Sequence, residues 1–343
     1  MKALVYYGPR DIRYMDVETP EPKENEVLIK VKAVSICGSD LGAYKNGSNM
    51  RVPPLIMGHE FSGEIAKLGD GVEELKIGDR VGVVTNLYCG YCADCKAGLS
   101  NVCDNRKIIG TTMMAGSYNG AMAEYVVAPA EKIMLLPDNI SFNEAALAEP
   151  LSISLRATKH AGDLKGKTVA VYGSGPIGLL AIQCINYFGA KRIIAIDLID
   201  DRLEMAKKCG ATDVINSKDD VVGITRKMTD GVGVDVVFDA AGVPETVNGG
   251  VEIVRNGGTV VWIGLAVPKF EFDYKHAVCK EITFKCSYMY TTEMQEGIEM
   301  IKTGKMNVGQ IITGIYHMSE GSRIFEELAS GKSKDIKVIL YND

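Results

Sequence analysis

A loop in the first half of the chain carries four of its nine cysteines, at Cys89, Cys92, Cys95 and Cys103. Four thiolates at such spacing can reach the corners of a tetrahedron around one Zn²⁺ and leave no coordination position open, which defines a structural site. In a reducing compartment a cysteine cluster is more typical of a metal site than of disulfides. We therefore expect structural zinc. Because spacing alone does not choose the metal, an iron–sulfur cluster remains the main alternative, ahead of four unrelated buried thiols.

A second set of potential ligands is spread more widely: Cys37 in SICGSD, His59 and Glu60 in MGHEFSG, and Glu149 in LAEPLS. All are good Zn²⁺ ligands, and three protein ligands with one open position make a catalytic site. Each follows an apolar run or stands beside glycine, so we expect these side chains at exposed loop positions. The long separations do not by themselves indicate a site. On spacing alone the four residues read as a buried thiol, a loop histidine and two surface carboxylates.

A glycine-rich turn, YGSGPIG, follows an apolar segment and precedes a helical one. Its GxGxxG pattern comprises Gly173, Gly175 and Gly178, with Pro176 and Ile177 between the last two. The glycines permit a tight turn, and the amino terminus of the helix offers free N–H groups and a partial positive charge to a pyrophosphate. No lysine of the ATP-binding P-loop pattern follows. The pattern predicts a dinucleotide site; the alternative is a turn needed only for packing the helix on the sheet.

The residue that ends the next strand distinguishes NAD from NADP. Asp197 ends RIIAID, and we expect its carboxylate to accept hydrogen bonds from the adenosine ribose hydroxyls and to repel a 2′-phosphate. Arg202, five positions later, could instead approach such a phosphate. NAD is the predicted cofactor, and NADP stays open. Gly264 and Leu265, at the end of TVVWIGL, complete the predicted cofactor-binding residues.

Two patterns of apolar residues divide the chain. Up to about residue 150, short β-branched runs separated by Gly, Pro and Asp predict a mostly β barrel or sandwich; the runs are VLIKVKAV, GEIAKLG, DRVGVVT and AEYVVAP. From Lys167 to about Lys285, continuous Val/Ile runs alternate with amphipathic helices, the pattern of a doubly wound parallel sheet. From about Ser287 a helix and short strands follow.

Composition narrows the class of partner. The 343 residues are 46% hydrophobic and 24% charged, which is typical of a globular protein of about two domains. The net charge of -6 is spread over interspersed acidic and basic residues, so nucleic acid is not an expected partner. The amino-terminal residues lack the apolar region of a signal peptide, and no apolar run reaches the roughly 18 residues of a membrane span. We expect a soluble, cytoplasmic protein that does not bind membranes.

Taken together, GHEFSG, the four-cysteine loop, GSGPIG and AEPL resemble the zinc-dependent medium-chain dehydrogenases. The likeness covers nearly the whole chain and is greatest to the polyol branch: sorbitol, butanediol and galactitol phosphate dehydrogenases, in which a glutamate followed by proline replaces a cysteine of the alcohol dehydrogenases. The resemblance implies an α/β plus β fold and a homodimer or homotetramer. It also suggests that TVVWIGL, near the edge of the Rossmann sheet, could pair across a two-fold axis. It implies three segments: a GroES-like β-barrel catalytic domain over residues 1–152, an inserted Rossmann NAD-binding domain over 153–287, and a return to the catalytic domain over 288–343.

The resemblance also assigns roles to the scattered ligands. It implies catalytic zinc held by Cys37 and His59, with Glu60 and Glu149 as direct, exchanging or water-mediated ligands. The zinc would polarise the oxygen of a secondary alcohol so that a hydride can pass to NAD. Ser39, two residues after Cys37, would pass the hydroxyl proton outward, or would only form a turn. The implied cofactors are one catalytic zinc, one structural zinc and NAD.

Several positions depart from the family pattern or leave it open. Many members have a relay histidine at the position of Gly42, and sorbitol dehydrogenases tend to have an arginine where this chain has Met289. Lys45 lies in a stretch closer to the galactitol phosphate enzymes and could meet a phosphate, or it is a solvated loop lysine. Tyr44, Tyr118 and Tyr288 could line the substrate cleft or serve as packing aromatics.

Three functions follow from these observations. The first is a zinc-dependent oxidoreductase that transfers a hydride between NAD and a secondary alcohol of a polyol or sugar alcohol, as sorbitol dehydrogenases do. The second, within the enzymes, is a galactitol-1-phosphate 5-dehydrogenase or a 2,3-butanediol dehydrogenase. The third is a non-catalytic NAD-binding protein that keeps the structural zinc. Cys37, Ser39, His59 and Glu60 argue against the third, because a protein without turnover has no physical need of all four groups.

Overall fold

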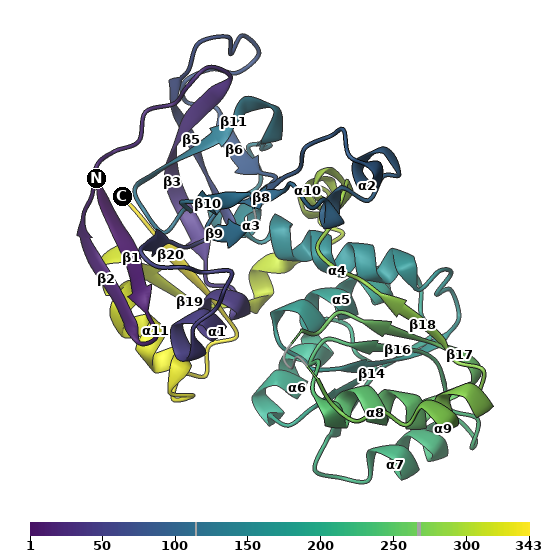
Figure 1. Cartoon of the computed structure of the whole chain (residues 1–343). Helices are drawn as coiled ribbons and strands as arrows, with labels where there is room; N and C mark the ends of the chain where they lie inside the picture. Colours follow the sequence, from purple (N-terminus) through teal and green to yellow (C-terminus); the bar gives the residue numbers. More distant parts are fainter. Residues whose placement is uncertain (114, 266–268) are drawn as a thin grey trace. The chain divides into compact units, whose positions relative to one another are not determined.

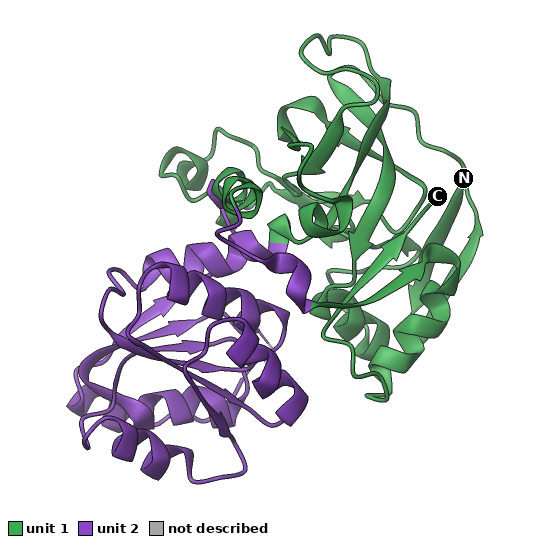
Figure 2. Ribbon diagram, turned by 180° about the vertical axis from the view of Figure 1, so that it is seen from behind, with its two compact units in different colours: residues 1–149, 294–303, 312–343 green, residues 150–293, 304–311 purple. Residues whose placement is uncertain are grey.

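The structure is a computed structural model that describes residues 1–113, 115–265 and 269–343. The chain forms two compact units (Figure 2). Unit 1 comprises Met1–Glu149, Met294–Thr303 and Ile312–Asp343, and unit 2 comprises Pro150–Glu293 and Gly304–Ile311. These bounds lie a few residues from the divisions predicted after residues 152 and 287. The prediction did not include the return of residues 304–311 to unit 2.

Unit 2 is built on a six-stranded parallel sheet with the order β15-β14-β13-β16-β17-β18. Its strands are β13 (Thr168–Tyr172), β14 (Arg192–Asp197), β15 (Asp213–Asn216), β16 (Val234–Asp239), β17 (Val254–Trp262) and β18 (Thr283–Cys286). The inner strands β13, β14 and β16 are buried along nearly their whole length, as expected for strands covered on both faces. The predicted doubly wound Rossmann sheet is confirmed.

Helices cover both faces of this sheet; in Figure 1, α4 and α5 lie on one side and α8 and α9 on the other. They are α4 (Ala148–His160), α5 (Pro176–Tyr187), α6 (Asp200–Lys208), α7 (Val221–Met228), α8 (Pro244–Ile253) and α9 (Tyr274–Cys279), followed by the short η3 (Val308–Ile311). The strand order reverses between β13 and β16, the switch point at which such sheets bind ligands. TVVW of the TVVWIGL segment lies in β17, next to the edge strand β18, as expected; the predicted pairing across a two-fold axis was wrong, because β16 and β18 pair with β17 on both sides.

Unit 1 is built on a mainly antiparallel seven-stranded sheet with the path β12-β6-β5-β3-β20-β19, and β11 also pairs with β3. Its strands are β3 (Glu26–Ser35), β5 (Phe61–Leu68), β6 (Arg80–Val83), β11 (Tyr125–Pro129), β12 (Ile133–Leu135), β19 (Ile312–His317) and β20 (Lys337–Tyr341). The four short strands expected in the first 150 residues are β3, β5, β6 and β11. The mostly β prediction for this part of the chain is therefore confirmed.

Smaller elements complete unit 1. A three-stranded sheet and two hairpins comprise β1 (Lys2–Gly8), β2 (Asp11–Asp16), β4 (Leu55–Ile56), β7 (Asn86–Leu87), β8 (Lys107–Ile108), β9 (Thr111–Met113) and β10 (Gly116–Tyr118). The helices are α1 (Gly38–Asn46), α2 (Ala93–Lys96), α3 (Phe142–Ala146), α10 (Glu293–Lys302) and α11 (Gly321–Ala329), with the short η1 (Ser100–Val102), η2 (Ala130–Lys132) and η4 (Met318–Glu320). One large apolar core, formed mainly by β1, β3, β5 and α11, supports these elements.

The carboxyl-terminal strand β20 joins the two halves of the large sheet. It runs antiparallel to β3, with Ile339 opposite Ser35, and parallel to β19. This register places the start of β20 beside the end of β3. Residues near position 337 and residues near position 37 therefore share one edge of unit 1.

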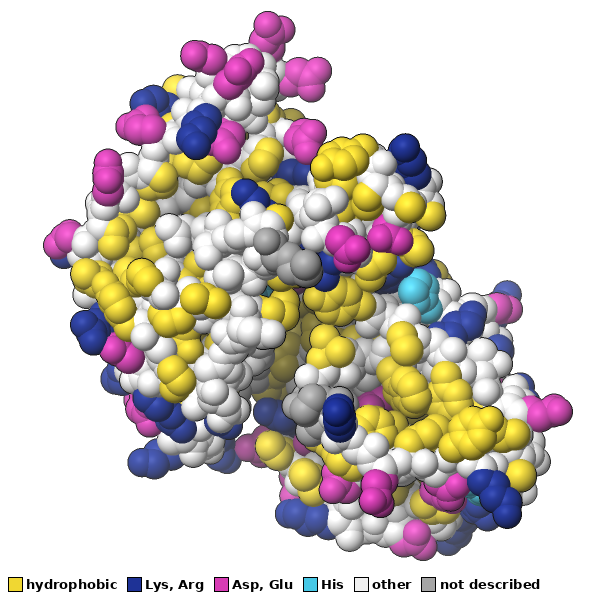
Figure 3. Space-filling model, viewed as in Figure 1, with side chains coloured by type: hydrophobic (Ala, Val, Ile, Leu, Met, Phe, Trp, Pro, Cys, Tyr) yellow, Lys and Arg dark blue, Asp and Glu magenta, His cyan; other side chains and the backbone are white. Residues whose placement is uncertain are grey.

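Within the described residues, none of the helices is both long and apolar enough to cross a membrane. On the face drawn in Figure 3, acidic and basic side chains are interspersed, as the sequence predicts.

Candidate metal and cofactor sites

The pairing of β3 with β5 brings Cys37 and His59 together. β3 ends two residues before Cys37, β5 begins two residues after His59, and the two strands are hydrogen-bonded neighbours. Cys37 also caps the amino end of α1, where its Sγ accepts a hydrogen bond from the backbone N–H of Ser39. The ligand atoms of Cys37, His59 and Glu60 all lie within 4.8 Å of one another. The structure thus assembles three of the four predicted ligands.

His59, Glu60 and Glu149 are buried, so the exposure expected for them was wrong, although Cys37, His59 and Glu60 do lie outside the helices and strands, as expected. The exposed fraction is 8% for His59, 2% for Glu60 and 4% for Glu149, and Cys37 is half-buried. Glu149 lies in the first turn of α4 rather than in a loop. Because the sheet and the helix bury these polar groups, each needs a hydrogen bond, an ion pair or a metal ion to offset the cost of its burial.

Glu149 lacks such a partner. Its Oε2 is buried and has no hydrogen-bond partner among the described residues. Burial raises the pKa of Glu149 to about 8, and the nearby Glu60 and Cys37 add to the rise, against an opposing effect of His59. An unpaired buried carboxyl beside a cysteine and a histidine is the donor set that a divalent cation would satisfy.

The charges around the cluster also fit a divalent cation. The buried Asp40 and Glu60 are paired with the cations Arg51 and Lys337. Burial, together with Glu60 and Asp40, raises the pKa of the Cys37 thiol to about 12, so both Cys37 and Glu149 hold a proton at neutral pH. A divalent ion that replaced these two protons would leave the total charge of the buried site unchanged. The residues therefore fit Zn²⁺.

Two hydrogen-bond donors to Glu60 were not predicted from the sequence. Its Oε2 accepts hydrogen bonds from the Ser35 hydroxyl and from the Lys337 ammonium group. Lys337 is 2% exposed and also donates to the carbonyl of Ile36 at 3.2 Å. Burial alone would lower the pKa of Lys337, but Glu60 and the neighbouring acids outweigh it and raise that pKa. Lys337 stands 277 residues from Glu60, and no local signal could have found it.

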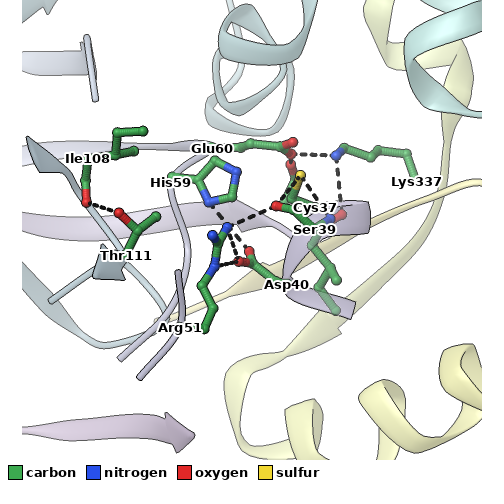
Figure 4. Close-up of polar contacts among 11 residues, drawn as sticks. Cys37, Ser39, Asp40, Arg51, His59, Glu60, Ile108, Thr111 and Lys337 are labelled. Atoms are coloured by element: carbon green, nitrogen blue, oxygen red, sulfur yellow. Dashed lines mark hydrogen bonds and ion pairs between the residues drawn. The ribbon is translucent and has the colours of Figure 1, made fainter. Parts of the chain in front are cut away.

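A second missed pair lies on the other side of His59 (Figure 4). The His59 Nδ1 is 3.5 Å from Oδ2 of Asp40, which has no exposed surface. The Arg51 Nε donates to Oδ1 of Asp40 at 3.0 Å. A carboxylate beside Nδ1 favours the tautomer that carries its proton there and leaves Nε2 free for a metal. The one sequence signal for Asp40 is its position three residues after Cys37, in the first turn of α1.

Ser39 lies where a proton relay would need it. Its Oγ donates to Cys37 Sγ at 3.2 Å and accepts a hydrogen bond from Arg51 Nη2 at 2.9 Å. The residue as a whole is exposed. Ser39 therefore links a predicted metal ligand to solvent, and its role in proton transfer stays a prediction.

The four-cysteine loop also converges on one point. The Sγ atoms of Cys89, Cys92, Cys95 and Cys103 lie within 4.8 Å of one another, with separations of 3.5, 3.8 and 3.9 Å for three of the pairs. A tetrahedron with Zn–S bonds of about 2.3 Å has edges of about 3.8 Å. One ion fits this space, whereas a multi-iron cluster would hold the thiolates farther apart. Although desolvation opposes it, the N–H groups of Tyr91 and Cys92 lower the pKa of Cys89 to about 6.

The glycine turn has the geometry that its pattern predicts. Gly173 has φ +87°, a left-handed conformation that favours glycine. A Cβ on Gly178 would lie 1.7 Å from the carbonyl oxygen of Gly173, so no larger residue fits. A Cβ on Gly175 would meet no protein atom within 4 Å, and Gly175 precedes Pro176, the first residue of α5. The fold itself therefore requires glycine at positions 173 and 178. Gly175 instead faces open space that a pyrophosphate could fill.

Asp197 lies at the carboxyl end of β14 and is 7% exposed. Its Oδ2 accepts a hydrogen bond from the Ser174 N–H at 2.7 Å, and its Oδ1 accepts one from the Ile199 N–H at 2.9 Å. The carboxylate therefore ties the glycine turn to the strand end and keeps lone pairs for further donors. Arg202 is half-buried in α6. These positions agree with a ribose site, and the ligand contacts stay predictions.

The remaining predicted cofactor residues and the tyrosines considered for the substrate cleft differ in exposure and in what they contact. Gly264 follows β17, where a Cβ would lie 2.3 Å from the backbone N of Gly242, so packing alone explains this glycine. Leu265 is 77% exposed at the same edge of the sheet. Tyr44 is 4% exposed, stacks on Phe325 and bonds to Glu326, as a packing aromatic does. The Tyr118 hydroxyl donates to a backbone carbonyl of β11.

The comparisons with known proteins agree with this geometry. Residues 23–138 match the alcohol dehydrogenase GroES-like domain, and residues 176–303 match the zinc-binding dehydrogenase domain. The chain is 36% identical to the sorbitol dehydrogenase of Bacillus subtilis, over 99% of this chain and 97% of the relative.

Two solved structures are also similar. The galactitol-1-phosphate dehydrogenase of Escherichia coli is 28% identical, with a TM-score of 0.92 over 100% of both chains. An alcohol dehydrogenase from Escherichia coli CFT073, solved with NADH, is 29% identical, with a TM-score of 0.91 over 100% of this chain and 99% of that one. This chain therefore belongs to the zinc-dependent medium-chain dehydrogenases, in their polyol dehydrogenase branch.

Proposed function

We propose that this protein oxidises a secondary hydroxyl of a polyol or sugar alcohol and passes the hydride to NAD. The observation that carries the proposal is the cluster of Cys37, His59 and Glu60 beside the unpaired carboxyl of Glu149. A non-catalytic protein would gain nothing from a buried acid without a partner, because such a group costs stability.

The chemistry divides between the cofactors and the chain. A zinc ion bound by Cys37, His59 and one or both glutamates would supply Lewis acidity at the substrate oxygen. The Asp40 carboxylate, 3.5 Å from His59 Nδ1, favours a proton on that nitrogen, and Lys337 forms an ion pair with Glu60. Ser39 accepts the proton of the substrate hydroxyl and releases its own toward solvent. Hydride transfer then requires the carbinol carbon to meet the nicotinamide ring.

NAD is the proposed cofactor because of Asp197. Its fixed carboxylate stands at the strand end where ribose hydroxyls are bound in Rossmann domains, and it would repel a 2′-phosphate. The relative from Escherichia coli CFT073 was solved with NADH.

The first experiment measures NADH formation with sorbitol, xylitol, 2,3-butanediol and galactitol 1-phosphate, each with NAD and with NADP. We expect turnover of at least one unphosphorylated polyol with NAD, loss of turnover after chelation, and recovery with Zn²⁺. Activity that survives complete removal of metal from the Cys37 site would contradict the proposal. Turnover restricted to the phosphate ester would support the second candidate, for which the observation is the exposed Lys45 in the last turn of α1.

A matched pair of glycine variants tests the cofactor site. Gly175→Ala creates no clash, so the variant should keep the stability of unit 2 while its affinity for NADH falls by about tenfold or more, because the added methyl occupies ligand space. Gly178→Ala forces a contact with Gly173 and should lower stability itself. Unchanged NADH binding by a stable Gly175→Ala protein would remove the cofactor from this turn.

We also propose a cytoplasmic protein that assembles as a homodimer or homotetramer and does not bind nucleic acid or membranes. A four-thiolate zinc site needs reduced cysteines, and the cytoplasm supplies that condition. Light scattering of the purified chain would give the subunit count.

A further inference from the structure

Arg51 contacts two functional groups of the Cys37 site at once (Figure 4). Its side chain is 5% exposed and lies in the irregular segment between α1 and β4. Nε and Nη2 approach Asp40 Oδ1 at 3.0 and 2.9 Å, and Nη2 also donates to Ser39 Oγ at 2.9 Å. One guanidinium group thus joins the acid that orients His59 to the serine beside Cys37.

The hydrogen bonds of Ser39 limit what its hydroxyl can do. A serine hydroxyl has one proton and two lone pairs. The Arg51 guanidinium occupies one lone pair and, because it can only donate, it can never take a proton from Ser39. The second lone pair remains for the hydroxyl of a substrate. The proton of Ser39 itself must then leave toward another acceptor.

The site offers few acceptors for that proton. Cys37 Sγ, the present acceptor, is a predicted metal ligand. Asp40 has no exposed surface; Arg51 lies at its Oδ1, and its Oδ2 faces His59 Nδ1 at 3.5 Å. The residue at position 42 is a glycine, which has no side-chain acceptor. Ser39 is exposed, so water is the acceptor that the geometry leaves.

We propose that Arg51 is a positioning residue that orients the Ser39 hydroxyl for proton transfer and directs its proton to water. This inference rests on the proposed function. In alcohol oxidation the substrate hydroxyl gives its proton to Ser39 Oγ, Ser39 gives its own proton to water, and the carbinol carbon gives a hydride to NAD, so that a ketone, NADH and one proton result. Arg51 stabilises the negative charge that develops on Oγ while the two protons move.

A purely structural role predicts something different. If Arg51 served only to neutralise the buried Asp40, its loss would disturb His59 and hence the metal, and Ser39 would not matter. Arg51→Lys separates the two roles. Lysine keeps a positive charge for Asp40, but a single ammonium group lacks the planar fork that reaches both Asp40 and Ser39.

The experiment combines this variant with Ser39→Ala in a double-mutant cycle, and Arg80→Lys serves as the control. Arg80 donates to the backbone carbonyls of Pro137 and Ile140 and lies over the Phe142 ring, and none of these partners belongs to the Cys37 site. For each protein we would measure bound zinc, the unfolding temperature, NADH affinity, kcat, KM, and the solvent deuterium isotope effect on kcat.

We expect Arg51→Lys to keep two zinc ions per chain and wild-type NADH affinity, while kcat falls about 10- to 100-fold and KM changes little, because general acid–base steps contribute at least that much. The solvent isotope effect should rise. In the Ser39→Ala background Arg51→Lys should cause no further loss, and Arg80→Lys should behave as wild type.

Three results would overturn the inference: an unchanged kcat in Arg51→Lys, losses that multiply in the double variant, or a loss of zinc that accounts for the whole effect. Arg51→Lys could also fail to fold, and a second variant then tests the inference. In that last case Arg51→Ala with added guanidinium ions replaces it, and saturable recovery of kcat, absent in Ser39→Ala, supports the inference. No recovery overturns it. A wild-type protein without any alcohol turnover would instead refute the proposed function.

Discussion

The four-cysteine loop takes all its predicted ligands from residues 89–103, whereas the Cys37 site takes its residues from positions 35 to 337. The loop is partly exposed, with only Cys103 fully buried, and the Cys37 site is buried on almost all sides. Both sites fit a zinc ion, but different groups would balance the charge of that ion at each site. The loop uses four thiols and short backbone contacts, and the Cys37 site uses mixed ligands surrounded by buried ion pairs.

Each site has a buried lysine nearby, and the two lysines differ in what they contact. Lys337 pairs with Glu60, and both are 2% exposed. Lys132 lies 3.8 Å from the ring centre of Tyr88, the neighbour of Cys89, and pairs with the exposed Glu131. Lys337 neutralises the buried carboxylate of Glu60, whereas the ammonium group of Lys132 lies over the ring of Tyr88. The Cys37 site therefore depends on a long-range charge pair, and the loop depends on local structure.

The largest expected effect is on activity at the Cys37 site. Cys37→Ala should reduce kcat by more than roughly 100-fold, since even residues that only contact a ligand are worth 10- to 100-fold. Fold and NADH binding should change little, because unit 2 forms its own sheet. Metal content, circular dichroism and NADH formation would be compared with those of Cys286→Ala, an exposed cysteine on β18. Full activity in Cys37→Ala would place the chemistry elsewhere.

The next effect is on stability. Lys337→Met should lower the free energy of unfolding of unit 1 by about 3–5 kcal/mol, because it leaves the Glu60 carboxylate buried without its cation. Urea titration would measure the change. Glu60→Gln combined with Lys337→Met should recover part of the loss, and a double variant as unstable as Lys337→Met alone would show that the pair is not what stabilises this strand.

Zinc uptake should differ between the sites in its dependence on pH. Cys37 and Glu149 have pKa values raised to about 12 and about 8, so binding at this site must release about two protons below pH 8 and about one above it. Affinity should therefore rise about 100-fold per pH unit below pH 8. In the metal-free chain, stability that the protonated Glu149 contributes should be lost as pH rises through about 8.

The loop should show a steeper dependence, because zinc there must displace protons from several thiols: the pKa of Cys89 is lowered to about 6, but burial and the neighbouring thiols raise the pKa of Cys95 to about 12. Competition with a chelator between pH 6 and 8 would follow both ions, with Cys37→Ala and Cys92→Ala used to assign them. Equal pH slopes at the two sites would remove this distinction.

The smallest expected effect belongs to Lys132. Lys132→Met keeps the apolar stem and removes the charge above Tyr88, so we expect a loss of about 0.5–2 kcal/mol in unfolding free energy and full catalytic activity. Thermal unfolding and NADH formation would be compared with wild type. A loss as large as that of Lys337→Met would contradict the view that the loop depends only on local contacts.

Sequence patterns predicted the local parts of this protein well. The strands β3, β5, β6 and β11 and the Rossmann elements are where apolar periodicity placed them. TVVWIGL was placed correctly near the sheet edge but was wrongly expected to be free for pairing, because the short strand β18, which covers it, gave no strong signal. Burial of His59 and Glu60 was missed for the same reason: the covering elements come from far along the chain.

What the sequence by itself determined are the sets whose members are neighbours along the chain: the four thiols of the loop and the glycines before α5. Their geometry follows from one turn of backbone, so spacing suffices to predict it. Only the tertiary structure decided that Lys337 holds Glu60, that Arg51 joins Asp40 to Ser39, and that Glu149 is left unpaired. The Lys337 contact depends on the register of β20 on β3, which no short segment encodes. The Arg51 contacts span only 11 and 12 residues, but they depend on how the irregular segment after α1 folds back, which its residue types do not reveal.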